Sequence, residues 1–343
     1  MNRVAVVVVN YKGIEDTKHC LAALSEQTFK DFTIIAIENG SHDRSVDEFK
    51  KFEQQYGDNL ITLYNDKNLG FDGGVNTGIH WAMERDFEYI ILCNNDALPD
   101  ENWVKSLVAA ADKKPAHGII TSLLLLEDGT TIDSTGDWYS KWGLPFPRNR
   151  HDKTEKAPKA EDVFGGTGGA SLFRMKMLRE IGIFDEDFFA YYEDIDISFR
   201  AQLYGWKVYY EPKAIAYHQQ GATANRMPGH FAVYQTFKNL PLVYIKNVPR
   251  GLLFSIGIRF WFAYALMLGN AIVKGRGWDA IKGWLMSIVL FWTSALPKRL
   301  KIQKDKKVSA AYIRSILWAD LPPDQTGLRK LRRLFIRKSH ETT

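Results

Sequence analysis

The sequence predicts an α/β fold, a mostly parallel sheet flanked by helices, followed by a helical C-terminal extension. Over the first 122 residues, short apolar runs alternate with amphipathic stretches, which is the pattern of βαβ units. From about residue 231 the chain becomes apolar and basic. We therefore expect an α/β domain over residues 1–228, with halves 1–122 and 123–228, and a helical region over residues 229–343.

The first half contains the clearest periodic signals. Apolar runs of five or six residues predict strands, and longer amphipathic stretches predict helices. The expected strands are residues 4–9, 32–37, 60–64, 89–93 and 118–122, and the expected helices are residues 14–25, 45–55, 74–85 and 101–113.

The second half begins with an irregular segment over residues 127–162, rich in Gly, Pro, Lys and Asp, which opens with the turn signal Glu127-Asp128-Gly129. After it we expect a strand at 171–173, helices at 175–181 and 195–204, and short strands at 208–210 and 214–217. These last strands return the chain toward the sheet.

Composition bounds the class of protein. The 343 residues are 45% hydrophobic and 25% charged, which indicates a folded chain. The two cysteines, Cys20 and Cys93, lie in apolar segments and are expected to be buried thiols in a reducing compartment. Residues 4–9 are too short for the core of a signal peptide, so we expect none.

The C-terminal region favours a membrane surface. Residues 252–273 carry one charge, Arg259, and residues 284–296 form a second, shorter apolar run. The net charge of the chain is +5, but the segment from Lys298 onward alone carries +9. Apolar helices bordered by Lys and Arg suit the cytoplasmic face of the plasma membrane, bound peripherally or shallowly inserted. The alternative is a helical subdomain packed on the catalytic core, and we expect no binding to nucleic acid.

Two acidic clusters indicate an enzyme. Asn94-Asn95-Asp96 follows an apolar strand, where ligands of open α/β sheets bind. A carboxylate with diphosphate oxygens and water is a usual way to hold magnesium or manganese, and His218, after a later strand, could share that metal. Taken alone, an Asp at the end of a strand, such as Asp96, is more often a turn or cap residue than a metal ligand.

The second cluster is Glu193-Asp194-Ile195-Asp196. Three carboxylates in four positions repel one another, which raises the pKa of any that are buried together. A carboxylate in a cleft can then take a proton from a hydroxyl. The alternative is an acidic first turn of an exposed helix, but that does not account for the four aromatic residues just before it, Phe188, Phe189, Tyr191 and Tyr192.

Two further segments follow strands. Glu38 stands before Asn39-Gly40-Ser41, where a carboxylate can accept hydrogen bonds from a base or ribose, although a plain turn explains the pattern as well. The glycine-rich residues 68–78 could pack a sugar diphosphate or simply join a strand to a helix. Their glycines are not in G-x-G-x-x-G order, which makes an oxidoreductase improbable.

Taken in order, these segments resemble family-2 glycosyltransferases with the GT-A fold, in their rhamnosyltransferase-like branch. The resemblance covers about residues 4–225. It is carried by Val6-Val7-Val8-Val9-Asn10-Tyr11, Glu38-Asn39-Gly40-Ser41, Asn68-Leu69-Gly70-Phe71, Asn94-Asn95-Asp96, Gly168-Gly169-Ala170, Phe184-Asp185-Glu186, Glu193-Asp194-Ile195-Asp196 and His218.

The resemblance implies a GT-A nucleotide-diphosphosugar transferase that transfers a sugar with inversion, best guess rhamnose, from a dTDP- or UDP-linked donor. The acceptor would be a hydroxyl of a lipid-linked or cell-envelope saccharide, and the cofactor Mg or Mn. The implied roles are as follows: Asp194 is the base, with Glu193 and Asp196 shaping its site; Asp96 and His218 bind the metal; Asn10, Tyr11, Glu38, Asn68, Gly70, Asn94 and Asn95 hold the nucleotide sugar; Gly168, Gly169 and Tyr192 lie on the acceptor side.

The sequence departs from the family pattern at two positions. Asn94 stands where the family's D-x-D motif begins with Asp, and Glu38 stands where Asp is usual. The contacts of these two side chains with the donor therefore stay open. A non-catalytic sugar-nucleotide or membrane scaffold protein is the competing interpretation, and the sequence does not indicate an oligomeric state.

Overall fold

The computed structural model describes residues 3–219 and 230–323. The expected boundary between residues 228 and 229 and the basic tail after residue 323 lie outside these residues. In the described part, ten strands form one mixed sheet, β10-β12-β6-β11-β4-β1-β2-β3, with β5 paired to β12 and β7 to β6. The strands are β1 Val4–Asn10, β2 Phe32–Asn39, β3 Leu60–Asn65, β4 Tyr89–Cys93, β5 Ala97–Pro99, β6 His117–Leu126, β7 Ile132–Ser134, β10 Glu161–Val163, β11 Ala170–Arg174 and β12 Lys207–His218.

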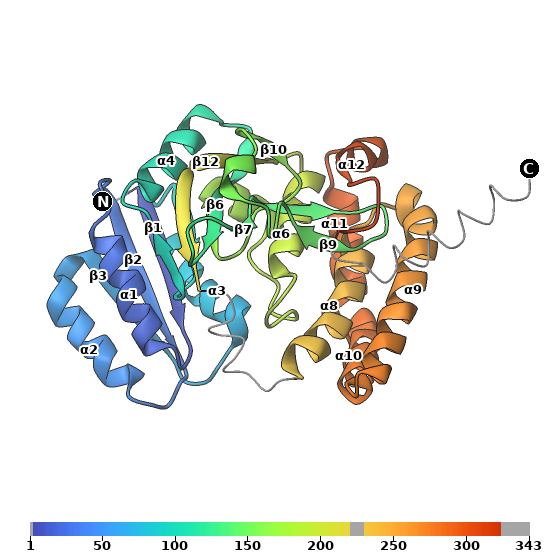
Figure 1. The fold of residues 1–343 in the computed structure, drawn as a ribbon, viewed down its shortest axis with the longest axis horizontal. Coiled ribbons are helices and arrows are strands. Elements are labelled where there is room, and N and C mark those ends of the chain that lie inside the picture. Colours follow the sequence, from blue (N-terminus) through green and yellow to red (C-terminus); the bar gives the residue numbers. More distant parts are fainter. Residues whose placement is uncertain (1–2, 220–229, 324–343) are drawn as a thin grey trace, which may run out of the picture.

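The N-terminal half of the sheet is parallel and covered on both faces, as expected. β1 pairs in parallel with β2 and β4, and β2 with β3. Side chains alternate along β1: Val4, Val6 and Val8 enter one apolar core, and Ala5 and Val7 enter the other. Two layers of helices cover these cores (Figure 1). One layer is α1 Ile14–Ser25, α2 Ser45–Tyr56 and α4 Trp103–Lys113; the other includes α3 Gly70–Met83, α5 Met175–Ile181 and α6 Glu193–Leu203.

The second half of the sheet is mixed, which the sequence did not predict. β11 lies antiparallel between β4 and β6, and β12 runs parallel to β6. The two short strands expected at 208–210 and 214–217 are one strand, β12, whose register shifts between Glu211 and Ile215. Pro212 lies in this irregularity, because a proline has no N–H to donate to the neighbouring strand.

The insertion over residues 127–162 folds over the carboxyl end of the sheet. It contains β7, a small hairpin of β8 Asp137–Tyr139 with β9 Pro145–Pro147, and the short helix η2 Thr154–Lys156. The expected turn is present, since Asp128 accepts hydrogen bonds from the backbone N–H of Thr130 and Thr131. A 3-10 turn, η1 Gly57–Asn59, precedes β3.

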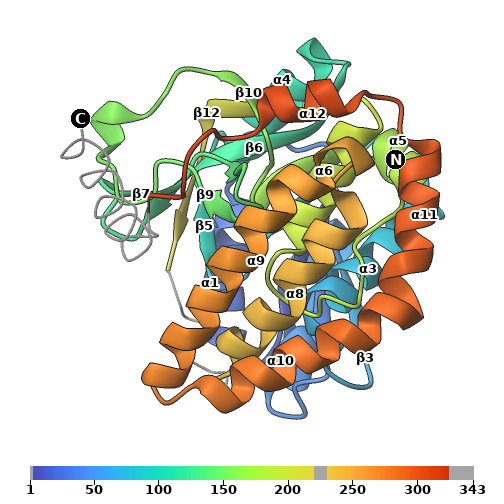
Figure 2. The ribbon, with the colours of Figure 1, turned by 90° about the vertical axis from the view of Figure 1, so that its right-hand side faces the viewer.

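Helices from the C-terminal region pack side by side against α6 and the insertion (Figures 1 and 2). They are α8 Phe231–Asn247, α9 Arg250–Val273, α10 Gly277–Leu290, η3 Phe291–Ala295, α11 Leu296–Asp305 and α12 Ala310–Ile316. Pro241 inside α8 leaves the carbonyl of Phe237 without its helical partner. The hydroxyl of Tyr264 donates to that carbonyl at 2.7 Å, which joins α9 to α8.

The second apolar run is longer than the sequence indicated. The expected run of residues 284–296 lies inside one continuous helical stretch, Gly277–Asp305, of 29 residues. Its central turn is a π-helix just before Pro297, and the wider turn accommodates the proline ring. This stretch and α9 are both long and apolar enough to cross a membrane, yet 22% and 33% of their most apolar windows are buried against the protein.

Candidate active site

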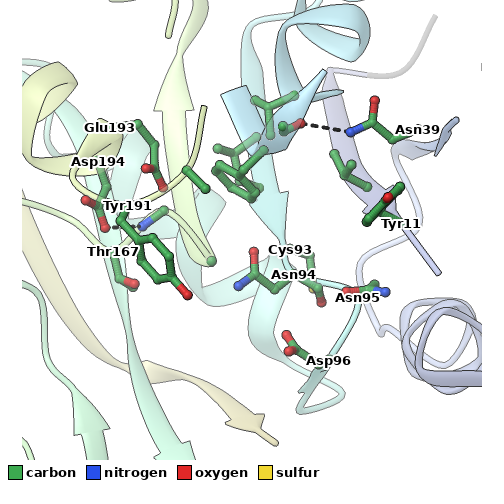
Figure 3. Close-up of a pocket in the computed structure, with 18 of the residues that line it drawn as sticks. Tyr11, Asn39, Cys93, Asn94, Asn95, Asp96, Thr167, Tyr191, Glu193 and Asp194 are labelled. Carbon is green, nitrogen blue, oxygen red and sulfur yellow. Dashed lines mark hydrogen bonds between the residues drawn. The ribbon is translucent and has the colours of Figure 1, made fainter. Parts of the chain in front are cut away.

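A cavity of about 450 Å³ lies at the carboxyl ends of the central strands, between the N-terminal half of the sheet and the start of α6. Figure 3 shows Glu193 and Asp194 on one side of it, Asp96 with Asn94 and Asn95 in the centre, and Tyr11 with Asn39 on the far side. The cavity brings together most of the expected site residues: Tyr11, Asn68, Gly70, Asn94, Asn95, Asp96, Gly168, Gly169, Glu193, Asp194 and His218.

Four expected site residues lie outside the cavity lining: Asn10, Glu38, Tyr192 and Asp196. The Asn10 side-chain oxygen accepts from the Gly13 N–H and the Thr17 hydroxyl, so it closes the turn before α1. The Glu38 carboxylate accepts the N–H groups of Gly40 and Ser41 at 3.1 and 2.9 Å. Both side chains therefore shape loops next to the cavity and do not face into it.

Asn39, which the sequence interpretation treated only as a turn residue, lines the cavity in place of Glu38. Its amide donates to the Gly70 carbonyl at 2.8 Å and to the Asn68 side chain at 3.3 Å. Gly70 has φ +75, and a Cβ there would lie 2.3 Å from the carbonyl oxygen of Phe189. Glycine is thus required where the loop before α3 meets the segment before α6.

At the centre of the cavity, strand register brings Asp96 and His218 together. β5 pairs with the end of β12, which sets Ala97 opposite His218. The His218 Nε2 atom lies 3.3 Å from Asp96 Oδ1, and its Nδ1 atom lies 2.8 Å from Asp133 Oδ2. Asp133 is buried on β7 and also contacts Arg150. Neither Asp133 nor Arg150 was expected in the site, because nothing in the insertion's sequence signals its position over the sheet.

The donor atoms at this place fit a divalent cation that also binds diphosphate. Adjacent ligands of an octahedral ion with bonds of about 2.1 Å lie about 3.0 Å apart, close to the Asp96–His218 separation. Asp133 holds the far nitrogen of the ring, as carboxylates do for metal-bound histidines. Among the described residues, no three or more His, Cys, Asp or Glu are grouped so that they could together hold a metal ion, so the remaining ligands would come from substrate and water.

The electrostatics of His218 agree with such a site. Burial lowers the pKa of the imidazole, but its hydrogen bonds with Asp133 and Asp96 outweigh burial and raise it to about 9. The imidazole is therefore protonated between the two carboxylates, and a cation that binds its nitrogen would have to displace that proton.

On the opposite wall, Asp194 stands in the first turn of α6 with its carboxylate fixed by backbone donors. Its Oδ2 atom accepts from the Gly168 N–H at 3.2 Å, and its Oδ1 atom accepts from the Ile195 N–H at 2.8 Å. Burial raises the pKa of Asp194, although these hydrogen bonds and the charge of Arg150 oppose the rise. Burial and the charge of Asp194 raise the pKa of Glu193 to about 8.

Asp196 has a different environment from its two neighbours. It is fully buried and lies 2.8 Å from both Arg200 and Lys246, and the Asn247 amide donates to it at 2.8 Å. Burial alone would raise the pKa of Asp196, but Lys246 and Arg200 lower it below its usual value. This carboxylate fixes α6 to α8 and does not face the cavity.

The segment just before α6 has an unusual backbone. Phe189, Tyr191 and Tyr192 all have positive φ, between 64° and 72°, which costs L-residues energy. Two neighbouring residues of α8 hold it: Lys238 donates to the carbonyls of Asp187 and Phe188, and Asn239 to those of Phe188, Ala190 and Tyr191 at 2.8–3.0 Å. Helix α8, from the C-terminal region, therefore sets the wall that precedes Asp194.

Gly169 explains the close packing beside Asn94. A Cβ at Gly169 would lie 2.6 Å from the Asn94 side chain, and the Asn94 N–H donates to the Gly169 carbonyl at 2.9 Å. The glycine pair 168–169 thus lets the end of β4 and the start of β11 approach each other at the cavity.

Comparison with known proteins identifies relatives. The family model described as glycosyl transferase family 2 matches residues 5–182, just over half of the chain. The chain is 27% identical over 252 residues to the N-acetylglucosaminyl-diphospho-decaprenol L-rhamnosyltransferase of Mycobacterium tuberculosis, covering 67% of this chain and 80% of the relative. It is 22% identical to a low-salt glycan biosynthesis hexosyltransferase of Haloferax volcanii, covering 73% and 79%.

Solved structures show the same fold. The mannosyltransferase of Pyrobaculum calidifontis, in complex with GDP-Man and Mn²⁺, superposes with a TM-score of 0.54 at 15% identity and covers 92% of this chain and 85% of its own. Residues 1–349 of Staphylococcus aureus TarS, in complex with UDP-GlcNAc, give 0.54 at 14% identity, covering 89% and 90%. The fold is therefore of the GT-A type, and the chain belongs to glycosyl transferase family 2 as a nucleotide-sugar-dependent glycosyltransferase.

Proposed function

We propose that the protein transfers a sugar, best assigned as rhamnose, with inversion from a dTDP- or UDP-linked donor to a hydroxyl of a lipid-linked saccharide. One observation carries this proposal: a half-buried, hydrogen-bonded carboxylate, Asp194, and the Asp96–His218 pair face one cavity from opposite sides. The similarity to the mycobacterial rhamnosyltransferase, whose name contains a diphospho-decaprenol, supports the sugar and the acceptor class.

In the proposed reaction, Asp194 accepts the proton of the acceptor hydroxyl. The hydroxyl oxygen forms a bond to the anomeric carbon as the bond from that carbon to the diphosphate oxygen breaks on the opposite face. The electron pair of the breaking bond leaves with the nucleoside diphosphate. A divalent cation held by Asp96 and His218 would offset the negative charge that grows on the diphosphate.

The remaining residues are assigned by their position. Tyr11, Asn68, Gly70, Asn94 and Asn95 would contact the nucleotide sugar directly. Asn10 and Glu38 would act on it through the loops that they close. Gly168 and Gly169 would border the acceptor, with Tyr192 behind them, while Glu193 and Asp196 would set the environment and the position of the base.

Ligand-dependent thermal unfolding tests the donor class. UDP, dTDP, GDP and NAD are each added with Mn²⁺ or with EDTA. A ligand at 100 times its dissociation constant stabilises the folded state by about 2.7 kcal/mol. We expect stabilisation by dTDP or UDP that depends on Mn²⁺. A response to NAD alone, or to none of the four, would contradict the proposed function.

We also propose that the protein binds the cytoplasmic face of the plasma membrane through α9 and α10. These helices lie at the surface facing the viewer in Figure 2. They and the turn after them expose large apolar side chains, among them Phe254, Ile258, Phe262, Trp278, Leu285, Val289 and Trp292. Lys274, Arg276 and Lys282 lie exposed beside these side chains. An apolar surface bordered by cations suits anionic lipid.

Vesicle flotation tests this surface. We expect the wild-type chain to float with phosphatidylglycerol vesicles and less with phosphatidylcholine vesicles. A Phe254→Ser, Trp278→Ser, Trp292→Ser variant should lose most of this binding, whereas Tyr64→Ser, an exposed aromatic on β3, should not. A wild-type chain that stays soluble without detergent and ignores anionic vesicles would refute membrane association.

A further inference from the structure

Arg150 is a basic side chain that the proposed reaction does not use. It lies in the insertion, between β9 and η2, and it lines the cavity together with Asp96, Asp194 and His218. Among the lining residues that the structure describes, it is the single Lys or Arg, and three carboxylates line the same cavity. The positive charge of Arg150 acts on Asp194, because it lowers the pKa of that carboxyl while burial raises it.

The backbone around Arg150 is strained and firmly held. Its two neighbours, Asn149 and His151, have φ of 57° and 70°. The Thr135 hydroxyl donates to the Asn149 side chain at 2.8 Å, and the His151 N–H donates to the Ile132 carbonyl at 2.9 Å. Strained residues of this kind cluster at ligand-binding positions, where surrounding structure keeps them in place.

The guanidinium is anchored by one edge, and no described residue bonds to the other edge, which could receive a ligand. Nε donates to the Asp133 carbonyl at 3.1 Å, and Nη2 lies 2.9 Å from Asp133 Oδ1. Neither interaction uses Nη1, and 38% of the side chain is exposed. Asp133 also contacts His218, so its one negative charge is shared between two basic side chains and does not neutralise Arg150 alone.

We propose that Arg150 is a phosphate-binding residue in the cavity, and that it recognises a diphosphate group through its free edge. A guanidinium offers paired N–H donors that match phosphate oxygens, and a site that excludes water strengthens this contact. The inference rests on the proposed glycosyl transfer. The phosphate has two possible sources there, the diphosphate of the donor and the diphosphate that links the acceptor saccharide to its lipid.

Variants at this position separate the sources. Arg150→Gln removes the charge, and Arg150→Lys keeps a point charge that can still pair with Asp133, so it guards against a folding defect in the first variant. Lys153→Gln is the matched control, because Lys153 lies in the same loop and is exposed. For each chain we would measure the dissociation constant of UDP and dTDP with Mn²⁺, and KM for a lipid-diphosphate acceptor and for the same saccharide on a neutral aglycone.

We expect Arg150→Gln to raise the dissociation constant or KM of the phosphate-bearing ligand at least tenfold. Arg150→Lys should raise it less, and Lys153→Gln should leave it unchanged. Weaker nucleotide binding alone assigns Arg150 to the donor. A higher KM for the lipid-diphosphate acceptor but not for the neutral one assigns it to the acceptor. If both values stay within twofold in a folded Arg150→Gln variant, the inference is overturned and Arg150 only pairs with Asp133. If the wild-type chain binds no nucleotide and transfers no sugar, the proposed function itself fails.

Discussion

The two walls of the cavity are built in different ways. The side of Asp96 and His218 is set by strand register, since β5 and β12 pair Ala97 with His218, which brings the preceding residue, Asp96, beside the ring. Asp133 comes from β7, which pairs with β6. The side of Asp194 is set by side chains of α8, which hold a strained segment from outside the sheet. The first wall therefore depends on backbone pairing, and the second on a few buried polar groups that single substitutions can remove.

The largest effect should come from Asp194→Asn, which removes the proposed base and keeps the shape of its wall. General base catalysis contributes about 10²–10⁴ in rate, so kcat should fall by that factor while nucleotide binding stays unchanged. Steady-state kinetics and calorimetry check the two quantities separately. Asp47→Asn, an exposed acid on α2, is the control. Wild-type kcat in Asp194→Asn would instead show that Asp194 is not the base.

Asp133→Asn should act chiefly on the opposite wall, that of Asp96 and His218. The change removes the carboxylate that orients His218, and such changes typically cost 10–100-fold in metal affinity. We expect the Mn²⁺ concentration for half-maximal activity to rise by about that factor, with kcat recovered at saturating Mn²⁺. The control is Glu155→Gln, an exposed acid in the same insertion. An unchanged Mn²⁺ requirement would show that Asp96 and His218 do not hold the metal.

Asn239→Ala tests whether α8 controls the wall of the base. It removes the donor to three carbonyls, which should lower the free energy of unfolding by about 1–3 kcal/mol. If the segment positions Asp194, kcat should also fall, by roughly tenfold, while the dissociation constant of the nucleotide changes little. Asn270→Ala, at an exposed position on α9, is the matched control. Loss of stability with unchanged kcat would reduce the role of α8 to packing.

The smallest effect is a shift of the pH profile. Burial raises the pKa of Asp194, and its ionised form is the base, so kcat/KM should fall as the pH drops through that raised value. Arg150→Gln removes a charge that lowers the pKa of Asp194, so its acidic limb should move to higher pH. The profile is measured at saturating Mn²⁺, and a limb that moves to lower pH would contradict this placement of Arg150.

The sequence predicted the site residues that stand next to helices and strands with a clear hydrophobic pattern. Asp96, Asp194 and His218 each stand at the end or start of an element whose type was visible from its pattern, and all three meet in the cavity. The helix starts were less certain: α3 begins at Gly70 and α6 at Glu193, earlier than expected, because glycines and acids in a first turn resemble a loop.

The residues that were missed come from segments without a period. Asp133 and Arg150 lie in the irregular insertion, where only tertiary packing decides which side chains face the cavity. Lys238 and Asn239 lie on a helix whose contacts with residues 187–191 depend on the docking of the whole C-terminal region. Glu38 was expected to contact the donor. Instead, both of its carboxylate oxygens accept hydrogen bonds from backbone N–H groups of its own turn.

The pairing of α8 with residues 187–192 sets the minimal catalytic unit of this enzyme. A shortened chain that ended at residue 228 would contain Asp96, Asp194 and His218, yet it would lack Lys238, Asn239, Lys246 and Asn247. The backbone carbonyls of the strained segment before α6 and the buried Asp196 would then lose their hydrogen-bond and ion-pair partners in the C-terminal helices. Deleting the apolar helices to gain solubility should therefore yield a protein that retains the sequence motifs of a glycosyltransferase but not its turnover.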